Sequence, residues 1–106
     1  MHRLLVLAAC TAFAAGSGFA AGKANAAKGK EVFDQCSVCH NADSTEVKMG
    51  PGLKGLYKKA KMTNGKAPTD ATVTAKINAG GNGMPSYKDI LSDAEKNDVL
   101  AYLKTL

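Results

Sequence analysis

The segment from Cys36 to His40 holds the side chains whose types and spacing indicate a defined chemistry. Two cysteines separated by two residues are followed directly by a histidine, in the order Cys36-Ser37-Val38-Cys39-His40. This C-x-x-C-H pattern is the attachment signature of a c-type haem. Each thiol can form a thioether bond to the porphyrin, and the adjacent imidazole can bind the iron as an axial ligand. The sequence therefore predicts one covalent haem c at Cys36, Cys39 and His40.

Two other kinds of site use the same cysteine spacing, namely thioredoxin-like redox centres and zinc sites. The chain has three cysteines and two histidines, and Cys10 and His2 fall in a segment that we expect to be removed. A thioredoxin-like centre requires a preceding strand in a βαβ unit. A zinc site requires two further ligands. The rest of the chain offers neither, so haem attachment is the favoured interpretation.

The first 26 residues have the features of a secretory signal peptide. His2 and Arg3 form a short polar start, residues 4–15 are almost wholly apolar, and Ala24-Asn25-Ala26 places small residues where a signal peptidase reads them. We expect cleavage after Ala26, with a second possible site at Phe19-Ala20-Ala21. The sequence thus divides into a cleaved signal, 1–26, and one domain, 27–106, in the periplasm.

Two other interpretations of this amino-terminal segment are weaker. A membrane span needs about 20 apolar residues, and the stretch from Gly16 to Gly22 interrupts the apolar run. Leu7-Ala8-Ala9-Cys10 resembles a lipidation site, but residues 11–15 after it stay apolar instead of becoming polar. We therefore expect the mature protein to have neither a lipid at Cys10 nor a membrane span.

The charge balance argues against nucleic acid as a partner. Removal of Arg3 and Lys23 leaves twelve basic and nine acidic residues, a net charge of about +3. The basic residues are spread along the chain without a recognition motif. The densest group, called the lysine cluster below, consists of Lys54, Lys58, Lys59, Lys61 and Lys66. This cluster is either a solvated face or a docking patch for an acidic redox partner.

Apolar residues at helical spacing predict a helix at each end of the domain. The first stripe leads to the haem site and consists of Gly29, Val32, Phe33 and Cys36. The second stripe consists of Val99, Tyr102, Leu103 and Leu106. Ser92 and Glu95 form a capping box ahead of the second stripe. The domain is therefore expected to begin and end with a helix.

Two shorter helices are expected between the terminal ones. Leu53, Leu56 and Tyr57 indicate a short helix after the turn at residues 50–52. A second helix, marked by Val73 and Ile77, should begin near Thr69 or Asp70 and end at Gly80-Gly81. No alternating apolar pattern is long enough for a sheet, so the predicted fold class is all-α.

Residues 27–106 resemble a class I c-type cytochrome of the small bacterial monohaem type. The resemblance rests on four matches in the right order, at residues 36–40, 50–53, 83–87 and 91–103. It implies a small class I cytochrome c fold of three to five helices around one covalent haem. By the same resemblance the terminal helices cross closely at Gly29, with Phe33 and Tyr102 beside the crossing. The chain lacks the tryptophan that contacts a haem propionate in some relatives.

The resemblance also implies a support for the histidine ligand. In the family pattern, a carbonyl at the position of Pro51 accepts the other ring proton of His40. Such a hydrogen bond fixes the tautomer and the plane of a ligating imidazole. Pro51 is therefore expected to belong to the haem site.

The sixth iron ligand can be inferred by elimination. The mature chain has one histidine, so thioether ligands remain at Met49, Met62 and Met84. Met49 lies next to the turn that supports the proximal side, and Met62 lies among the lysines. Met84 stands between glycines, which permit close backbone approach, and a proline, which stiffens the chain. Although a methionine is more often a core residue, we favour Met84 as the ligand.

Histidine and methionine together fill both axial positions of the iron, which suits one-electron transfer better than substrate binding. We expect a monomeric, non-enzymatic electron carrier between respiratory or dehydrogenase donors and an oxidase or reductase. One alternative is a cytochrome subunit of a larger oxidoreductase. The other is a haem peroxidase or gas-binding protein, for which the mature chain offers no further histidine and no arginine.

Overall fold

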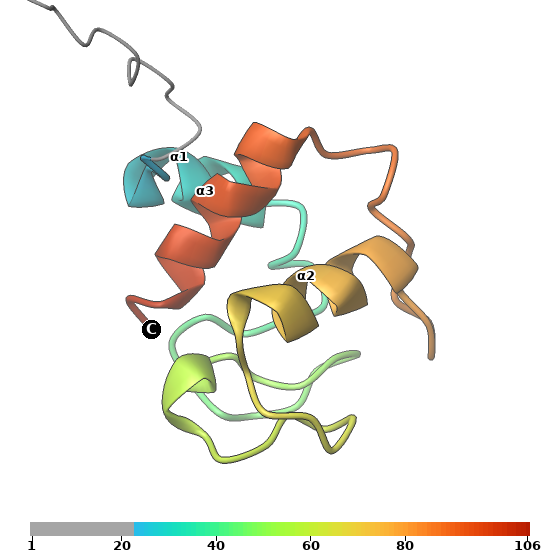
Figure 1. Ribbon diagram of the computed structural model, residues 1–106. Coiled ribbons are helices and arrows are strands. Elements are labelled where there is room, and N and C mark those ends of the chain that lie inside the picture. The colour runs from blue at the N-terminus through green and yellow to red at the C-terminus, as the bar shows by residue number, and fades with distance from the viewer. Residues whose placement is uncertain (1–22) are drawn as a thin grey trace, which may run out of the picture.

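The computed structural model describes residues 23–106, and these form three α-helices and one short 3-10 helix. In chain order they are α1 (Ala26–Phe33), η2 (Leu56–Lys58), α2 (Asp70–Ala79) and α3 (Asp93–Leu103) (Figure 1). Within the described residues there is no strand, only two isolated bridges. The all-α prediction is confirmed. Most of the expected signal segment, residues 1–22 with Cys10, lies outside the described residues.

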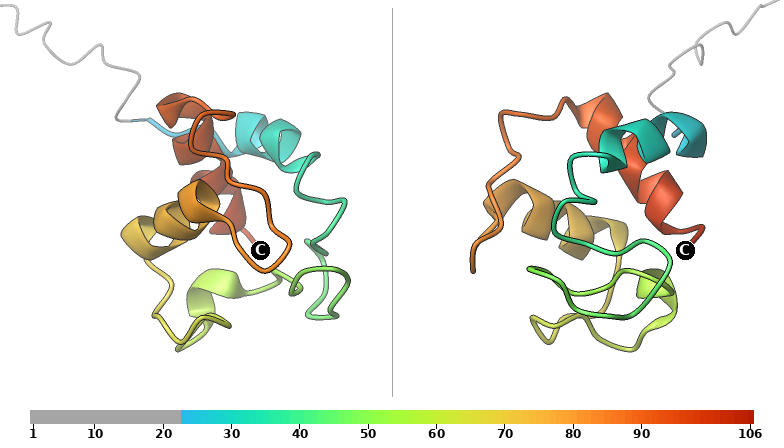
Figure 2. Two further views of the ribbon diagram at one scale, coloured as in Figure 1. Left: turned by 90° about the vertical axis from the view of Figure 1, so that its right-hand side faces the viewer. Right: turned by 180° about the vertical axis from the view of Figure 1, so that it is seen from behind.

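Helices α1 and α3 cross at one end of the molecule, and α2, η2 and their loops form the other end (Figures 1 and 2). The crossing requires glycine at position 29, because a Cβ there would lie 1.9 Å from the carbonyl oxygen of Asp98. Beside it, the rings of Phe33 and Tyr102 are 5.3 Å apart and tilted by 54°. The expected crossing of the terminal helices is therefore confirmed.

The amino-terminal end of α1 is joined to α3 through Asn25. The Asn25 side chain accepts a hydrogen bond from the backbone N–H of Lys28 at 3.1 Å, which caps the helix. The backbone N–H of Asn25 itself donates to Asp98 Oδ1 at 2.8 Å. Asn25 therefore belongs structurally to the folded domain, although it precedes the expected cleavage site.

At its other end α1 stops at Phe33, earlier than the apolar stripe suggested. The backbone N–H groups of Cys36 and Ser37 both donate to the Phe33 carbonyl, at 2.8 and 2.9 Å. The chain thus continues in turns, and Cys36 lies beyond the helix. Phe33 is nevertheless buried, and Cys36 is half-buried against the same core cluster.

Helices α2 and α3 both begin with a capping box. At α3 the Ser92 hydroxyl accepts from the Glu95 N–H at 3.1 Å, and the Glu95 carboxylate accepts from the Ser92 N–H at 2.9 Å. Thr69 and Thr72 form the corresponding pair at α2. Gly80 ends α2 with a φ of 64°, a left-handed value that glycine adopts without strain. These helix limits agree with the sequence predictions.

The core joins all four helices through eight buried apolar side chains. They are Phe33, Leu56, Val73, Ile77, Leu91, Val99, Leu100 and Leu103. Lys96 in α3 is the one buried charged residue in the described part of the chain. No helix formed by residues 23–106 has both the length and the apolar character to cross a bilayer.

A polar contact at the surface links η2, α2 and the end of α3. The Tyr57 hydroxyl donates to Asp70 Oδ1 at 3.1 Å, and Lys104 Nζ lies 2.9 Å from the same oxygen. The hydrogen bond from Lys104 lowers the pKa of Asp70. Burial, followed by the contact with Asp70, raises the pKa of Tyr57. Asp70 thus joins three segments that are far apart in the sequence.

Candidate functional site

Cys36, Cys39 and His40 lie on the tight turns that follow α1. The backbone N–H groups of Cys39 and His40 both donate to the Cys36 carbonyl, at 3.1 and 2.9 Å. This single helical turn places Cys36 and His40, four positions apart, on the same face. Both cysteines are half-buried free thiols. The turn therefore presents two thiols and one imidazole together.

The Cys36 thiol does not have the lowered pKa of a redox-active nucleophile. Burial, and secondly the neighbouring Cys39, raise the pKa of Cys36. Redox-active cysteines have the opposite shift, because the thiolate is their reactive form. Residues 23–106 also contain no group of three or more His, Cys, Asp or Glu side chains placed to hold a metal ion. The geometry thus favours haem attachment over the thioredoxin and zinc alternatives.

The imidazole of His40 is oriented by the backbone of the following loop. His40 Nδ1 lies 2.7 Å from the carbonyl oxygen of Pro51. A carbonyl can only accept, so Nδ1 carries the ring proton and Nε2 keeps its lone pair. Gly50 packs against the ring, since a Cβ there would lie 2.5 Å from His40 Cε1. The structure thus brings His40 and Pro51 together and leaves Nε2 available to a metal.

The loop that carries Gly50 and Pro51 is fastened onto the cysteine turn. Lys48 Nζ donates to the Ser37 carbonyl at 3.1 Å, and the Gly50 N–H donates to the Cys39 carbonyl at 2.9 Å. An isolated antiparallel bridge joins His40 to Val47. The loop and the turn therefore form one unit that holds the imidazole.

Three apolar side chains on this unit are exposed to solvent and are called the apolar surface group below. Val38, Val47 and Met49 are 70%, 74% and 81% exposed. Met49 Sδ lies 3.8 Å from Cys39 Sγ. No sequence signal marked this group as functional, although each member lies within ten residues of the C-x-x-C-H motif. Met49 therefore lies beside the cysteine turn, with most of its side chain exposed to solvent.

Met84 lies in a tight turn just beyond α2. The N–H of Gly81 donates to the Met84 carbonyl at 2.9 Å, and the N–H of Met84 donates to the Gly81 carbonyl at 3.1 Å. Gly81 and Gly83 have φ values of 107° and 90°, in the region that favours glycine. A Cβ at Gly80 would lie 2.4 Å from the Met84 carbonyl oxygen. This close turn therefore requires glycines around Met84.

Burial separates the three candidate methionines only in part. Met62 and Met84 are both half-buried and pack against the core, whereas Met49 is exposed. Met62 lies in the loop with the lysines, in a turn with one positive-φ glycine, Gly65, where an added Cβ would meet nothing. The turn of Met84 is more constrained, because a Cβ at Gly80 would overlap its carbonyl.

Tyr87 relates the Met84 turn to the cysteine turn. Tyr87, Met84 and Cys36 are all partly buried and pack against the same core cluster. Burial raises the pKa of Tyr87, and Cys36 and Cys39 contribute to the same shift. The Tyr87 N–H donates to the Ile77 carbonyl of α2 at 2.9 Å. In the sequence, Tyr87 belongs to the segment 83–87, but a single tyrosine carries no spacing signal for a site.

Asn78 on α2 has an amide oxygen that is buried and has no hydrogen-bond partner among the described residues. Buried acceptors are normally satisfied by protein, water or a bound group. The fit to a haem rests instead on the two free thiols and the imidazole whose Nε2 is available, which are the groups that a c-type haem requires.

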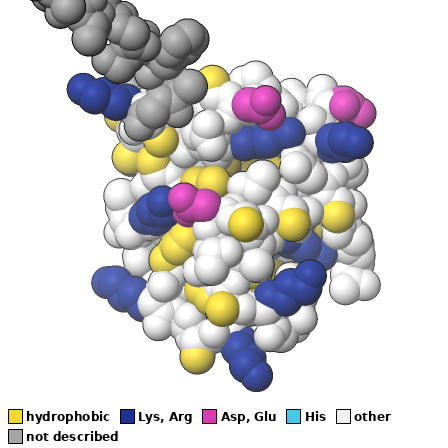
Figure 3. All heavy atoms as spheres, viewed as in Figure 1, with side chains coloured by type: hydrophobic (Ala, Val, Ile, Leu, Met, Phe, Trp, Pro, Cys, Tyr) yellow, Lys and Arg dark blue, Asp and Glu magenta, His cyan; other side chains and the backbone are white. Residues whose placement is uncertain are grey.

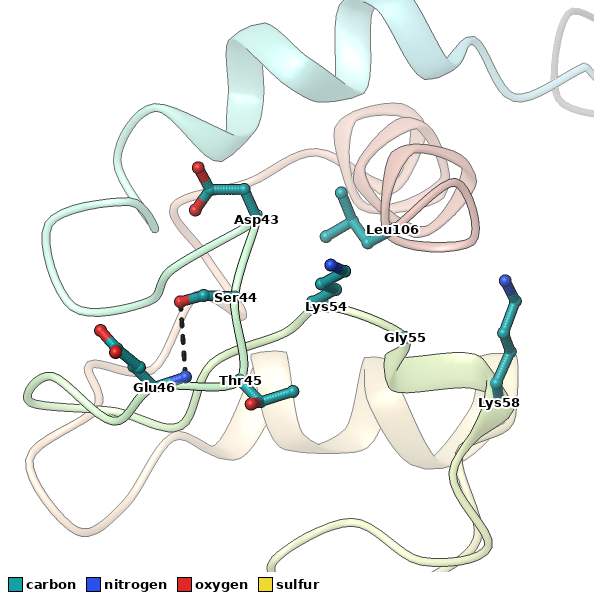
Figure 4. A pocket seen from close by; sticks show the side chains of 8 residues that line it. All are labelled: Asp43, Ser44, Thr45, Glu46, Lys54, Gly55, Lys58 and Leu106. Carbon is teal, nitrogen blue, oxygen red and sulfur yellow. Dashed lines mark hydrogen bonds between the residues drawn. The ribbon is translucent and has the colours of Figure 1, made fainter.

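The lysine cluster is exposed at all five positions. Lys54 and Lys58 line an open hollow of about 650 Å³, together with the acidic residues Asp43 and Glu46 (Figure 4). On the face seen in Figure 3, lysine side chains are spread around the molecule, with hydrophobic side chains visible between them. No candidate haem residue lines the hollow. A docking role for the cluster stays a prediction.

Comparisons with known proteins identify similar sequences and a similar fold. A family model described as cytochrome c matches residues 26–106. The chain is 36% identical over 81 residues to cytochrome c6 of Leptolyngbya boryana, covering 76% of this chain and 91% of the relative. It is 35% identical over 81 residues to cytochrome c6 of a Synechocystis strain, covering 76% of this chain and 64% of the relative.

A solved structure supports the fold independently of close sequence similarity. Cytochrome c6 from the diatom Phaeodactylum tricornutum superposes with a TM-score of 0.60 at 22% identity, over 76% of this chain and 92% of the other. At that level of identity the match supports the fold alone.

Proposed function

Because this chain belongs to the cytochrome c family, we propose that it shuttles single electrons in the periplasm between a respiratory or dehydrogenase donor and an oxidase or reductase. The protein is an electron carrier, not an enzyme, and it has one covalently bound c-type haem. When bound, the haem supplies an iron that alternates between the ferric and ferrous states by one electron. The chain's own residues attach, orient and enclose that group.

We assign the attachment and the proximal ligand to the turn after α1. Cys36 and Cys39 provide the two thioether sulfurs, and His40 provides Nε2. The observation that carries this assignment is the 2.7 Å contact between His40 Nδ1 and the Pro51 carbonyl. It fixes the imidazole as the tautomer that a metal requires, with Nε2 unprotonated.

The second axial ligand in this proposal is Met84. Its turn is shaped by three glycines, and its side chain is half-buried against the core. Met84, Tyr87 and Cys36 pack against the same core cluster, so the Met84 segment and the attachment turn border the same part of the fold. Two protein ligands leave no coordination position for a substrate, which supports electron transfer over peroxidase or gas-binding chemistry.

Partner docking in this proposal uses the surface beside the attachment turn. The apolar surface group lies next to Cys39, and Lys48 adds a positive charge beside it. A small apolar contact with a charged rim suits a short-lived complex, because rim charges act mainly on the encounter rate. The lysine cluster adds a broader positive field for an acidic partner.

The proposal is tested on the purified periplasmic protein. Intact-mass analysis should give the mass of the polypeptide plus one haem, and a mass equal to the bare polypeptide would overturn the attachment. Reduced and oxidised absorption spectra should show a low-spin iron with histidine and methionine ligands. Stopped-flow mixing with a reductant should then show one electron accepted per protein. Two electrons per protein, or turnover of peroxide at enzymatic rates, would contradict a simple carrier.

A further inference from the structure

Lys96 differs from every other lysine in the described residues because it is buried. Its residue is 7% exposed, and it lies in the second turn of α3, between Ser92 and the core residue Val99. A buried ammonium group loses hydration, and this loss has to be offset by hydrogen bonds or charges inside the protein. The partners of Lys96 therefore indicate what the buried charge does.

The main partner of Lys96 is a backbone carbonyl, not a carboxylate. Lys96 Nζ donates to the Lys88 carbonyl oxygen at 3.0 Å. Asp93 Oδ1 lies further away, at 3.9 Å, and the Asp93 side chain is fully exposed. An ion pair at that distance, with one partner fully solvated, contributes little. The hydrogen bond to Lys88 is thus the specific contact of the ammonium group.

Lys88 belongs to the segment that follows Met84. Residues 84–91 connect the Met84 turn to α3 without forming a helix or strand. The Tyr87 N–H and the Ser86 hydroxyl hold this segment to α2, through the carbonyls of Ile77 and Asn78. Among the described residues, the hydrogen bond from Lys96 is the only one that joins the segment to the body of α3.

We propose that Lys96 is a positioning residue that holds the segment 84–91 against α3 and thereby keeps Met84 seated as an axial ligand. This inference rests on the proposed function, because it takes Met84 as the ligand. Outward movement of this segment would carry Met84 with it. The hydrogen bond to the Lys88 carbonyl, four residues from Met84, resists that movement. Lys96 acts here through the segment and without contact to the haem.

The experiment compares three variants of the haem-loaded protein. Lys96→Met keeps the aliphatic volume and removes the donor, and Lys96→Arg keeps a cationic donor. Lys104→Met is the matched control. Lys104 caps the end of α3 and also donates a hydrogen bond, but its partner is Asp70, outside the segment 84–91. The rate at which cyanide or imidazole displaces the sixth ligand is measured for each, together with hydrogen exchange at the Tyr87 amide and the denaturant midpoint.

Hydrogen bonds from charged groups are strong enough that Lys96→Met should speed ligand displacement about tenfold or more. Exchange at the Tyr87 amide should rise with it, and Lys96→Arg should restore both. Lys104→Met should leave both near wild type. A lower midpoint for Lys96→Met with unchanged displacement and exchange would overturn the proposal, since Lys96 would then support only the core. If Lys96→Met does not yield folded protein, Lys96→Gln is measured by the same criteria.

Failure of the ligand assignment is distinguishable from failure of the Lys96 proposal. Met84→Ala is measured beside the Lys96 variants. If its absorption spectrum equals that of the wild type, Met84 is not the ligand, and the proposal falls for a reason that does not involve Lys96. If Met84→Ala loses the methionine ligation while Lys96→Met behaves like wild type in displacement, only the positioning role of Lys96 is wrong.

Discussion

His40 and Pro51 are joined by a 2.7 Å contact between the imidazole Nδ1 and the backbone carbonyl oxygen. The residue before Pro51, Gly50, lies against the same ring, where a Cβ would come within 2.5 Å of Cε1. One backbone segment thus determines both the tautomer of the imidazole and the position of its plane. Backbone atoms of the loop make both of these contacts with the ring, so substitutions that alter the backbone approach should affect them most.

The first prediction concerns Gly50→Ala. The new methyl group would overlap the His40 ring, so the ring or the loop must shift, and the histidine ligand should be displaced from its best position. We expect a lower yield of haem-loaded protein, an altered ligation spectrum and a lower thermal midpoint. Gly55→Ala is the control, because Gly55 has a φ of 70° and a Cβ added there would meet nothing within 4 Å. Its backbone strain should reduce stability by about 1–2 kcal/mol and leave the spectrum unchanged.

The second prediction separates the three methionines. Met84→Ala should lower the reduction potential and open the iron to cyanide, because a thioether ligand raises the potential and fills the sixth position. Met49→Ala should do neither, since Met49 is 81% exposed beside Cys39. Met62→Ala should reduce stability by removing a half-buried side chain but keep the ligation. Loss of the methionine ligation in Met62→Ala, with Met84→Ala unaffected, would reverse the assignment.

The parts of this fold that were predictable from sequence are those with local signals. The capping box of Ser92 and Glu95 and the left-handed stop at Gly80 depend on residues within one turn of each other. The end of α1 was not predictable. The apolar pattern continues at helical spacing to Cys36, but the helix ends at Phe33. The following turns still place Cys36 against the core.

The site shows the same distinction between local and distant information. The cysteines and His40 are adjacent in sequence, whereas the hydrogen bonds of Tyr87 with Ile77 and of Lys96 with Lys88 depend on how the segments pack. A lysine inside a helix normally indicates a solvated face. The burial of Lys96 follows from the path of segment 84–91 over α3, which no local pattern encodes.

The third prediction concerns the pH dependence of stability through Asp70. The hydrogen bond from Lys104 lowers the pKa of Asp70 in the folded state, so the carboxylate contributes stability above its unfolded pKa of about 3.9. That contribution is lost as the pH falls through the lower folded pKa. Both side chains are about half exposed, at 61% and 48%, which limits the contribution to about 0.2–1 kcal/mol.

The measurement is the free energy of unfolding of Asp70→Asn and wild type from pH 7 down to pH 2. The free energy of unfolding should be lower for Asp70→Asn than for wild type near neutral pH, and the two values should become equal in acid. Added salt should reduce the difference near neutral pH. Asp89→Asn is the control, an exposed carboxylate without an ion pair among residues 23–106. A difference between Asp70→Asn and wild type that is constant with pH would show that the charge of Asp70 is not the cause.

The fourth prediction concerns where the mature chain begins. A chain that starts at Ala27 lacks Asn25, and with it the cap of α1 and the hydrogen bond to Asp98. Its new ammonium terminus would also lie at the positive end of the helix dipole. A chain that starts at Gly22, after the second possible cleavage site, keeps both contacts. The shorter form should be less stable by about 1 kcal/mol.

Denaturant unfolding of the two haem-loaded forms, together with amino-terminal sequencing of the periplasmic protein, checks this prediction. Asn25→Ala in the longer form is the matched variant, because it removes the side-chain cap and keeps the backbone hydrogen bond to Asp98. Its stability should fall between those of the two forms. Equal stability of all three would mean that the contacts of Asn25 contribute nothing to the fold.

The last prediction concerns the lysine cluster, for which steering and simple solvation are the two competing interpretations. If the cluster steers an acidic partner, the association rate should fall as the Debye length shortens from about 30 Å at 0.01 M salt to about 8 Å at 0.15 M. Lys54 and Lys58 share their hollow with Asp43 and Glu46, so these carboxylates offset part of their field. The effect of the cluster should therefore be moderate.

The double change Lys58→Glu, Lys59→Glu is compared with Lys28→Glu, Lys30→Glu, which alters the net charge equally on exposed positions of α1. Stopped-flow electron transfer with the physiological partner should slow more for the cluster variant, and its salt dependence should weaken. Spectrum and potential should stay the same, because charges at the rim of an interface act on encounter. Equal slowing by both double variants would mean that the partner responds only to net charge, and the cluster is then a solvated surface.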